Sequence, residues 1–442
     1  MFRQRLDELV NLKHPLAQLA THIDWSVFER EWAGHFPSSR GRPATSTRLI
    51  AGLLYLQHTF ALSDEDVVWG WVENPYWQLF CGETWFQHRP PIDPSSLTRW
   101  RKRIGEAGLE WMLTQTIKAA ESEVIVDSTV QEKAIAHPTD SRLLERARQH
   151  LVKLAAEAGL ALRQNYNREA PRLAVQVGRY AHAKQYKRMR ASLKKLKTVV
   201  GRVWRDVGRQ LDKMPTTLRD RASDLLAKAK RLLTQKPRDK NKLYSLHAPE
   251  AECIAKGKTR QPYEFGVKVS IAATHKEGLV VGMRSMPGNL YDGHTLYETL
   301  EQVAILTEQQ PKEVFVDLGY CGAEVQAGTK VYHHKLERGI TGRLRRDIRR
   351  RSAIEPAIGH MKNDGRLRRN WLKVADGDAF NALLCGCGHN LEMILRKLRL
   401  FFAFIAAWMA SLHLIPGPGV TLAGLVDGAL DNDRPQTRLC LG

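Results

Sequence analysis

Two short apolar runs of the chain each end in an aspartate. Val124 to Val126 precede Asp127, and Val314 to Val316 precede Asp317. Short runs of β-branched and aromatic residues predict buried strands, each with a carboxylate at its end. A single aspartate in such a place is also a common turn or cap residue, so neither is specific alone. Together the two aspartates are candidates for one acidic site.

A third carboxylate, Glu355, lies on a helix predicted over residues 350–362. Arg351, Glu355 and Lys362 fall on one stripe of this helix, beside an apolar stripe. Glu355 would therefore lie at the rim of a buried face, with two cations in line to hold phosphate groups. Ser352 and Glu355 also fit a capping box, in which they serve only to start the helix. The apolar stripe consists of Ile354, Ala357, Ile358 and Met361.

Asp127, Asp317 and Glu355 are the candidate catalytic and metal-binding residues. Carboxylate oxygens suit Mg²⁺, which keeps coordination positions for water and phosphate oxygens. We expect two Mg²⁺ ions about 3.5–4 Å apart, which Mn²⁺ can replace, and an in-line displacement at phosphorus. Crowded carboxylates repel one another without cations, so the cluster itself favours metal binding.

The charge of the chain predicts a polyanionic partner. At 442 residues the chain is long enough for two or three domains. Lys and Arg outnumber Asp and Glu by 68 to 47, which gives a formal charge of +21. Nucleic acid is the partner that this balance favours, although ribosomal and membrane-surface proteins share it.

Cysteine spacing and apolar segments indicate the compartment. The six cysteines lack the spacing of a zinc ribbon, and we expect them to be reduced. The N-terminus has no signal-peptide core, and the apolar run Leu400 to Ile415 is shorter than the ~20 residues that span a bilayer. We expect a cytoplasmic, nucleoid-associated protein without a membrane partner.

Residues 1–120 are predicted to form a helical N-terminal DNA-binding domain. A helix capped at Ser63, followed by a basic helix after Asp93, has the outline of a helix-turn-helix. The alternative is a three-helix scaffold with a solvated basic face. The candidate ligands of DNA phosphates on the basic helix are Arg99, Arg101 and Lys102.

A mixed α/β catalytic core is predicted over residues 121–139 and 241–378, where alternating apolar runs indicate strands. A basic helical insertion at 140–240 separates the two parts, and a helical segment and tail follow at 379–442. The one-signed charge between Arg179 and Lys197 favours DNA contact over a simple solvated face.

The order of Asp127, Asp317 and Glu355 resembles that of DDE transposases with a ribonuclease-H-like core, specifically the IS4/IS5 superfamily. The glutamate signature of that group is Tyr-x2-Arg-x3-Glu-x6-Lys. Arg351, Glu355 and Lys362 match it in register, and Ile348 stands at the tyrosine position. Further resemblance to IS5-like insertion-sequence transposases runs through residues 262–268, 288–294, 316–322 and 388–390, and residues 40–110 resemble their N-terminal domain.

The resemblance implies an enzyme that moves an insertion sequence. A homodimer would bind the terminal inverted repeats of double-stranded DNA, cut the strands at the ends of the element and join the 3′ hydroxyls to target DNA. Two rival hypotheses are a ribonuclease-H-like nuclease or resolvase without strand transfer, and an inactive transposase that acts as a DNA-binding protein. The presence of all three acids argues against the second rival.

Two further sites invite a functional interpretation. Asp292 and His294 follow a predicted turn, and we interpret them as turn and cap residues rather than as support for the acidic site. Trp371 follows two arginines and could stack on an unpaired base, but we interpret it as a core residue.

Overall fold

The computed structural model of the protein describes residues 4–32, 34, 45–117, 123–237, 239, 242–256, 261–335 and 341–411. The chain divides into two compact units. Residues 1–104 and 387–442 form the first, and residues 105–386 form the second. The predicted tail beyond residue 411 lies outside the described residues.

The first unit is helical around an aromatic core. Trp25, Phe28 and Trp32 lie on one face of α3 and are buried, as their helical spacing predicts. Ser63 caps α5 in a full capping box with Asp66. The helices of this unit are α1 (Leu6–Leu9), α2 (Pro15–His22), α3 (Trp25–Trp32), α4 (Thr47–Thr59), α5 (Asp64–Glu73), α6 (Pro75–Phe80) and the first part of α7 (Ser95–Thr114).

The predicted helix-turn-helix outline is wrong in its connection. A helix-turn-helix joins its two helices by a turn of about three or four residues. Between α5 and the basic helix α7 lie a further helix, α6, and the loop of residues 81–94. The basic helix is present, but the compact motif around it is not.

Helix α7 changes direction at Gly105. This residue has φ 70° and ψ −178°, a conformation that is essentially restricted to glycine. The kink coincides with the boundary between the two compact units, which falls between Ile104 and Gly105.

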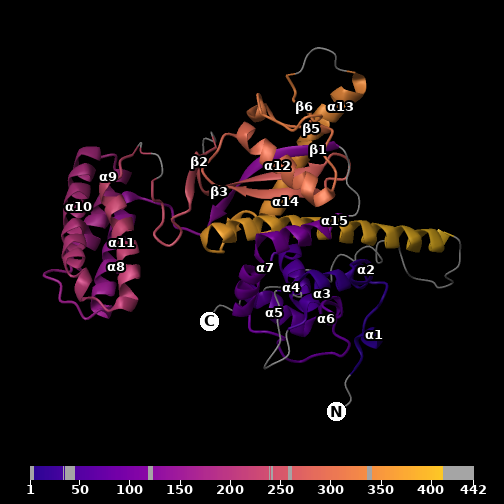
Figure 1. The fold of residues 1–442 in the computed structure, drawn as a ribbon, viewed down its shortest axis with the longest axis horizontal. Coiled ribbons are helices and arrows are strands. Elements are labelled where there is room, and N and C mark those ends of the chain that lie inside the picture. Colours follow the sequence, from indigo (N-terminus) through magenta and orange to yellow (C-terminus); the bar gives the residue numbers. More distant parts are fainter. Residues whose placement is uncertain are drawn as a thin grey trace. The chain divides into compact units, whose positions relative to one another are not determined.

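A seven-stranded mixed sheet forms the centre of the second unit (Figure 1). The strand order is β2-β3-β1-β5-β6, with β4 paired to β3 and β7 paired to β1. Strand β1 is central, because it pairs antiparallel with β3 and parallel with β5 and β7. The strands are β1 (Glu123–Lys133), β2 (Glu252–Ala255), β3 (Tyr263–Thr274), β4 (Val280–Met286), β5 (Glu313–Phe315), β6 (Lys330–Tyr332) and β7 (Arg369–Asn370).

Asp127 was predicted to lie at the end of a strand, and this position is wrong. The strand continues for six residues beyond Asp127, so this aspartate lies within the strand and not at its end. The polar run that follows is buried nonetheless. Gln131 and Lys133 are 0% and 4% exposed and bond to Asp378, whose carboxylate accepts from both side chains.

Helix α12 (Asp292–Thr307) covers one face of the sheet. Val124 and Val126 of β1 pack there with Leu296 and Leu300 of the helix. Successive residues of a strand point to opposite faces, so Ile125 and Asp127 face away from α12. That other face receives the short helix α14 (Ile354–Asn363), which follows β6 and the helix α13 (Gly342–Arg350) in the chain.

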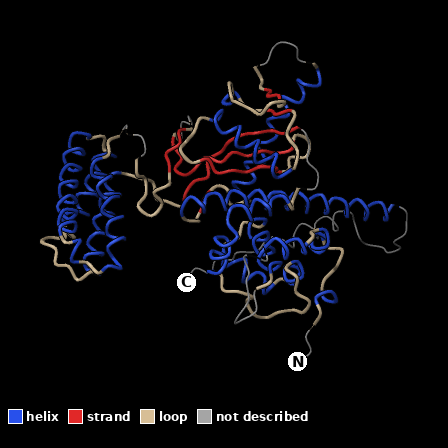
Figure 2. The backbone as a smooth tube through the Cα atoms, in the orientation of Figure 1, coloured by secondary structure: helices blue, strands red, loops and turns tan. Residues whose placement is uncertain are grey.

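Four helices between β1 and β2 form a bundle with a core of its own, drawn as neighbouring blue helices in Figure 2. Leu151, Leu196 and Val203 are fully buried within it. The helices are α8 (Asp140–Glu157), α9 (Glu169–His182), α10 (Tyr186–Arg209) and α11 (Thr216–Thr234).

The last described element is the long helix α15 (Val374–Ser411). Its start lies in the second unit and its remainder in the first. Among the described residues, none of the helices combines the length and the apolar character needed to cross a membrane.

Candidate active site

The strand register brings the two aspartates together. In the parallel pair of β1 and β5, Ile125 lies opposite Phe315. Asp127 and Asp317 each follow two residues later, so both side chains point to the sheet face opposite α12. Asp317 stands immediately before the 3₁₀ turn η3 (Leu318–Tyr320) and serves as its N-terminal cap residue.

Glu355 reaches the same face from the first turn of α14. Ile354 and Met361, both 2% exposed, anchor this helix, whereas the side chain of Glu355 is 61% exposed. The helix starts at Ile354 and not at residue 350, because a 3₁₀ turn, η4 (Arg351–Ala353), separates it from α13. The predicted capping box is also wrong: the Ser352 hydroxyl donates to the carbonyl oxygen of Arg349.

The guanidinium group of Arg351 joins the three carboxylates. It donates to Glu355 Oε1 at 3.2 Å, and it lies 3.8 Å from Asp127 Oδ2 and 4.0 Å from Asp317 Oδ1. The Arg351 side chain is 16% exposed and so is largely withdrawn from water. The structure thus gathers all three predicted acids, from β1, the turn after β5 and α14, around one positive charge.

The environment of Asp127 disfavours its ionised form. Burial is the largest cause and raises the pKa of this carboxyl above its usual value of 3.8. The N–H of Ser128, which donates to Asp127 Oδ1 at 2.7 Å, and the charge of Arg351 lower the pKa. The negative charges of Asp317 and Glu355 raise it again. Additional positive charge at this place would therefore stabilise the ionised acid.

The donor chemistry of the site fits a hard divalent cation, but its present spacing does not. Carboxylate oxygens are the ligands that Mg²⁺ and Mn²⁺ take. In the described part of the chain, no three His, Cys, Asp or Glu side chains are close enough together to hold a metal ion. The guanidinium of Arg351 lies between the acids and supplies the positive charge instead.

The predicted phosphate ligands differ in their surroundings. Arg99 and Lys102 are exposed on α7, but Arg101 is only 2% exposed. Its guanidinium donates to Asp64 and to Gln57, so the structure contradicts a phosphate-binding role for this side chain. Lys362 lies near the end of α14, seven residues after Glu355, and is half-buried.

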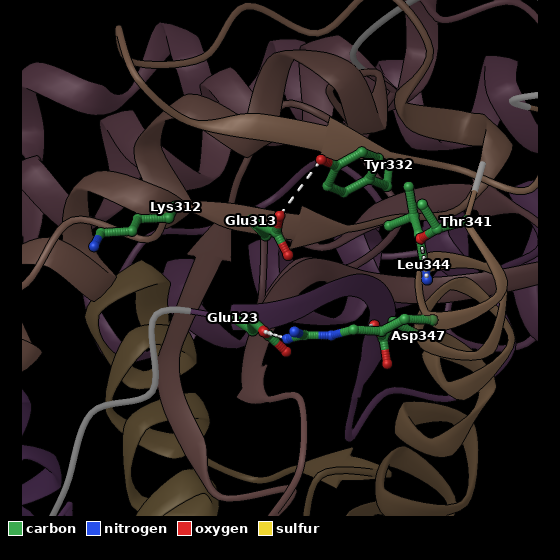
Figure 3. A pocket seen from close by; sticks show the side chains of 8 residues that line it. Glu123, Lys312, Glu313, Tyr332, Thr341, Leu344 and Asp347 are labelled. Carbon is green, nitrogen blue, oxygen red and sulfur yellow. Dashed lines mark hydrogen bonds and ion pairs between the residues drawn. The ribbon is translucent and has the colours of Figure 1, made fainter. Parts of the chain in front are cut away.

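A hollow of about 350 Å³ lies at the opposite end of β1 and β5 (Figure 3). Glu123 and Glu313, which face each other in the register, line it. Arg343 donates to Glu123 at 3.2 Å, and the Tyr332 hydroxyl donates to Glu313 at 3.4 Å. None of the predicted site residues lines this hollow, and its two glutamates have partners of their own.

Sequence reasoning missed the polar residues that support the site. Asp292, which we interpreted as a turn residue, accepts hydrogen bonds from Ser128 and Lys268. The interpretation of Trp371 as a core residue is wrong, because this side chain is 63% exposed, with the guanidinium of Arg369 over its ring at 4.8 Å. The position of Lys268 in an alternating strand carried no signal, since its partner lies on a different element.

The fold and the site together define a class: a strongly basic α/β protein in which three carboxylates, from the central strand β1, the segment after β5 and helix α14, meet at one face of the sheet. A family described as "Transposase domain (DUF772)" matches residues 4–103, and a family described as "Transposase DDE domain" matches residues 229–387. The chain therefore belongs to the DDE transposases. It is an enzyme that acts on DNA, in a family that generally uses divalent metal ions.

Other comparisons extend and limit this assignment. The chain is 53% identical over 196 residues to "Uncharacterized protein ORF8 in nfe locus" of Rhizobium meliloti. The aligned region covers 42% of this chain and 94% of that protein. No solved structure matches the chain. The DDE match includes Asp317 and Glu355 but begins after Asp127. Strand register, and not the family match, places Asp127 near Asp317, and the contacts of Arg351 link both acids to Glu355.

Proposed function

We propose that the protein is an IS5-like transposase of the IS4/IS5 superfamily. It binds the terminal inverted repeats of an insertion sequence and catalyses metal-dependent cleavage and transfer of DNA strands. The observation that carries this proposal is the meeting of Asp127, Asp317 and Glu355 around Arg351. The match of Arg351, Glu355 and Lys362 to the superfamily signature supports the subgroup.

We propose that the three carboxylates hold Mg²⁺, two ions in the active complex, within a ribonuclease-H-like core. When bound, the metal would stabilise the charge that develops on the attacking and leaving oxygens at phosphorus. The chemistry of the acids favours this occupancy, because burial and the charges of Asp317 and Glu355 raise the pKa of Asp127, and a bound cation would stabilise its ionised form.

Arg351 changes partner in this proposal. In the structure its guanidinium compensates three carboxylates. A divalent cation bound by the same oxygens would repel it, and a DNA phosphate offers a planar bidentate alternative. Arg351 would then orient the phosphate at which the displacement occurs. Lys362 on α14 and the exposed Arg99 and Lys102 on α7 would hold other phosphates.

Cleavage and strand transfer can share these residues. Both are displacements at phosphorus, with water as the nucleophile in the first and a 3′ hydroxyl in the second. No covalent bond between protein and DNA is needed, so no nucleophilic side chain is required of the site. We further propose that a homodimer brings the two ends of the element together.

The proposal predicts the effect of removing each carboxylate. Asp127→Asn, Asp317→Asn and Glu355→Gln should each lower Mg²⁺-dependent cleavage of an end-containing DNA duplex by about 10³-fold or more, since each loses several kcal/mol of metal-mediated stabilisation. Affinity for the same duplex, measured by gel shift in EDTA, should stay within about threefold of wild type.

Asp364→Asn is the matched control for these variants. Asp364 is an exposed acid at the end of α14 whose carboxylate is paired with His360 at 3.0 Å, so cleavage should not change. Normal cleavage by any of the three acid variants would show that the site assignment is wrong.

A nuclease or resolvase that only cuts is the rival enzyme class. A DNA duplex with a precut 3′ hydroxyl at the end of the element separates the two, because transposase should join this end to target DNA without a prior cleavage step. Cleavage of uncut ends without any joined product would favour the nuclease, and binding without either reaction would favour an inactive DNA-binding protein.

A further inference from the structure

The β1–β5 ladder ends before it reaches the two aspartates. Its last pair is Ile125 and Phe315, two residues before Asp127 and Asp317. Strand β1 is still held by β3 on its other side, where Asp127 lies opposite Ile271. No ladder pair in the described residues joins β1 to the Asp317 segment directly, so the separation of the two carboxylates depends on other contacts.

Asp292, the first residue of α12, bonds to the strand that carries Asp127. The hydroxyl of Ser128 donates to Asp292 Oδ1 at 2.8 Å, and the N–H of Ser128 donates to Asp127 Oδ1 at 2.7 Å. Because Asp127 and Ser128 are adjacent in a strand, their side chains lie on opposite faces of the sheet. Asp292 therefore supports Asp127 from behind and does not enter the acidic site itself.

The other carboxylate oxygen of Asp292 lies against the turn that carries Asp317. A Cβ atom added to Gly319 would lie 3.2 Å from Asp292 Oδ2, which is closer than such contacts ordinarily are. Gly319 is the second residue of η3, the turn that begins directly after Asp317. The glycine thus leaves room for the close approach of Asp292, and the next residue, Tyr320, is buried on the same side.

Lys268 fixes the orientation of the Asp292 carboxylate. Its ammonium group donates to Asp292 Oδ1 at 3.0 Å and to the carbonyl oxygen of Leu290 at 2.5 Å. The Lys268 side chain is 11% exposed and that of Asp292 is 30% exposed, so water screens the pair only in part. With Ser128 and Lys268 on one oxygen and Gly319 against the other, the carboxylate has little freedom to rotate.

We infer that Asp292 is a positioning residue that sets the separation between Asp127 and Asp317. One carboxylate braces both acid-bearing segments beyond the end of their ladder, through Ser128 on β1 and through Gly319 on η3. It acts through these neighbours and does not bind the metal or the DNA. This inference rests on the proposed metal site, and it assigns Lys268 and Gly319 to the same device.

The test compares metal affinity with DNA affinity in the full chain. Mn²⁺ binding, measured by calorimetry without DNA, should weaken about 10- to 100-fold in Asp292→Asn and Gly319→Ala, the range found for residues that orient metal ligands. The Mg²⁺ concentration for half-maximal cleavage should rise by a similar factor. Affinity for the end duplex in EDTA should not change, because neither residue faces the DNA in this proposal.

Asp292→Asn removes a negative charge, whereas Gly319→Ala leaves the charge of Asp292 intact. The added methyl group displaces Asp292 while leaving its ion pair with Lys268 chemically possible, so a shared effect identifies position as the cause. Glu298→Ala, which removes an exposed acid from the same helix, is the control and should bind Mn²⁺ as wild type does.

Each outcome separates this inference from the proposed function. Wild-type Mn²⁺ affinity in both variants would overturn the inference, as would a loss that only matches the fraction of unfolded protein measured by circular dichroism. If the wild-type chain binds Mn²⁺ but does not cut DNA ends, the proposed function fails, and the comparison of Mn²⁺ affinities still decides the role of Asp292.

Discussion

Arg351 is the residue that contacts all three carboxylates of the candidate site. Its guanidinium contacts Asp127, Asp317 and Glu355, which would otherwise repel one another. The same side chain therefore compensates the three negative charges and would compete with any cation that binds the same oxygens. This double role leads to a prediction that concerns both stability and metal affinity.

Arg351→Met should destabilise the metal-free protein and strengthen its metal binding. Loss of the cation should lower the free energy of unfolding in EDTA by about 1–2 kcal/mol, a modest value because Asp317 and Glu355 are half or more exposed. Mn²⁺ affinity should rise by up to about tenfold, since the competing charge is gone. Denaturant titration in EDTA and calorimetry with Mn²⁺ measure the two effects.

Arg349→Met is the control for this variant, because Arg349 is an exposed arginine on the preceding helix α13. A wild-type free energy of unfolding in Arg351→Met, or weaker Mn²⁺ binding, would contradict competition between the arginine and the metal.

The raised pKa of Asp127 predicts how stability depends on pH. A carboxyl group with a raised pKa binds its proton more tightly in the folded protein, so its ionisation destabilises the fold as the pH rises from 3.8 through the folded-state pKa. Asp127→Asn lacks this ionisation. In EDTA its melting temperature should exceed that of wild type at pH 7, and the difference should shrink as the pH falls toward 3.8.

Saturating Mg²⁺ provides the matching comparison. It should raise the melting temperature of the wild type and leave that of Asp127→Asn nearly unchanged, because the amide is a poor Mg²⁺ ligand by comparison. An Asp127→Asn protein that melts below wild type at pH 7 without metal would show that Arg351 compensates the aspartate more fully than burial penalises it.

Residue types and spacing identify the three acids, but only the structure shows which charged side chains are already paired and so cannot bind phosphate. The apolar runs before Asp127 and Asp317 and the signature around Glu355 identify the site in the sequence. Arg101 was misjudged because its partner Asp64 lies 37 residues earlier in the chain. Local pattern gives no measure of a pairing between two helices separated by a further helix and a loop.

At the scale of elements, the basic helix α10 offers the next prediction. Its sequence carries a single acid, Asp206, and Lys194 and Lys195 are exposed on it. If this face neutralises DNA phosphates, Lys194→Ala with Lys195→Ala should reduce the slope of log affinity against log salt by about 1.8, or 0.9 for each phosphate contact. Fluorescence anisotropy with non-specific duplex DNA over a salt series measures the slope.

A second double variant controls for the change of net charge. Lys153→Ala with Lys228→Ala also removes two lysines from the bundle, but these are paired with Glu157 and Asp224. Their removal should leave the slope unchanged. Equal slopes in both double variants would show that the α10 face is only a solvated surface.

Strand β1 shows why element boundaries were less predictable than element types. The sequence indicates a strand up to Asp127, because the residues before it are apolar. The strand continues through Gln131 and Lys133, which are buried because Asp378, some 245 residues later, satisfies them. A run of polar residues predicts a loop unless its distant partner is known. Strand β7 pairs with this polar end of β1, and it was not predicted for the same reason.

At the scale of the whole molecule, Gly105 links the two compact units. Its φ of 70° and ψ of −178° are costly for other residues, so Gly105→Ala should lower the free energy of unfolding by about 1–3 kcal/mol. Gly178→Ala, in the interior of α9 with open space around it, should instead raise it by about 0.5–1 kcal/mol. Urea unfolding of both variants gives the comparison, and a neutral Gly105→Ala would show that the kink relaxes without strain.

The fold class could be predicted from the sequence, but the order in which the strands pair could not. Apolar alternation indicates a mixed α/β protein, and the structure has a mixed sheet with helices. The central position of β1, with parallel and antiparallel neighbours, depends on residues on both sides of the helical bundle. No local pattern reports which distant strands become neighbours.

The central position of β1 has a consequence for synthesis on the ribosome. Asp127 and Asp317 are 190 residues apart (317 − 127), and the bundle is translated between them. At 5–20 residues per second, about 10–40 s pass between the two acids leaving the peptidyl-transferase centre. Strand β1 lacks β3 (Tyr263–Thr274) for most of that interval and β5 until its end, while the N-terminal helices are already synthesised. If the proposed function holds, a truncated chain would therefore carry its basic helices without a complete acidic site, so premature release would yield a protein that binds DNA without cutting it.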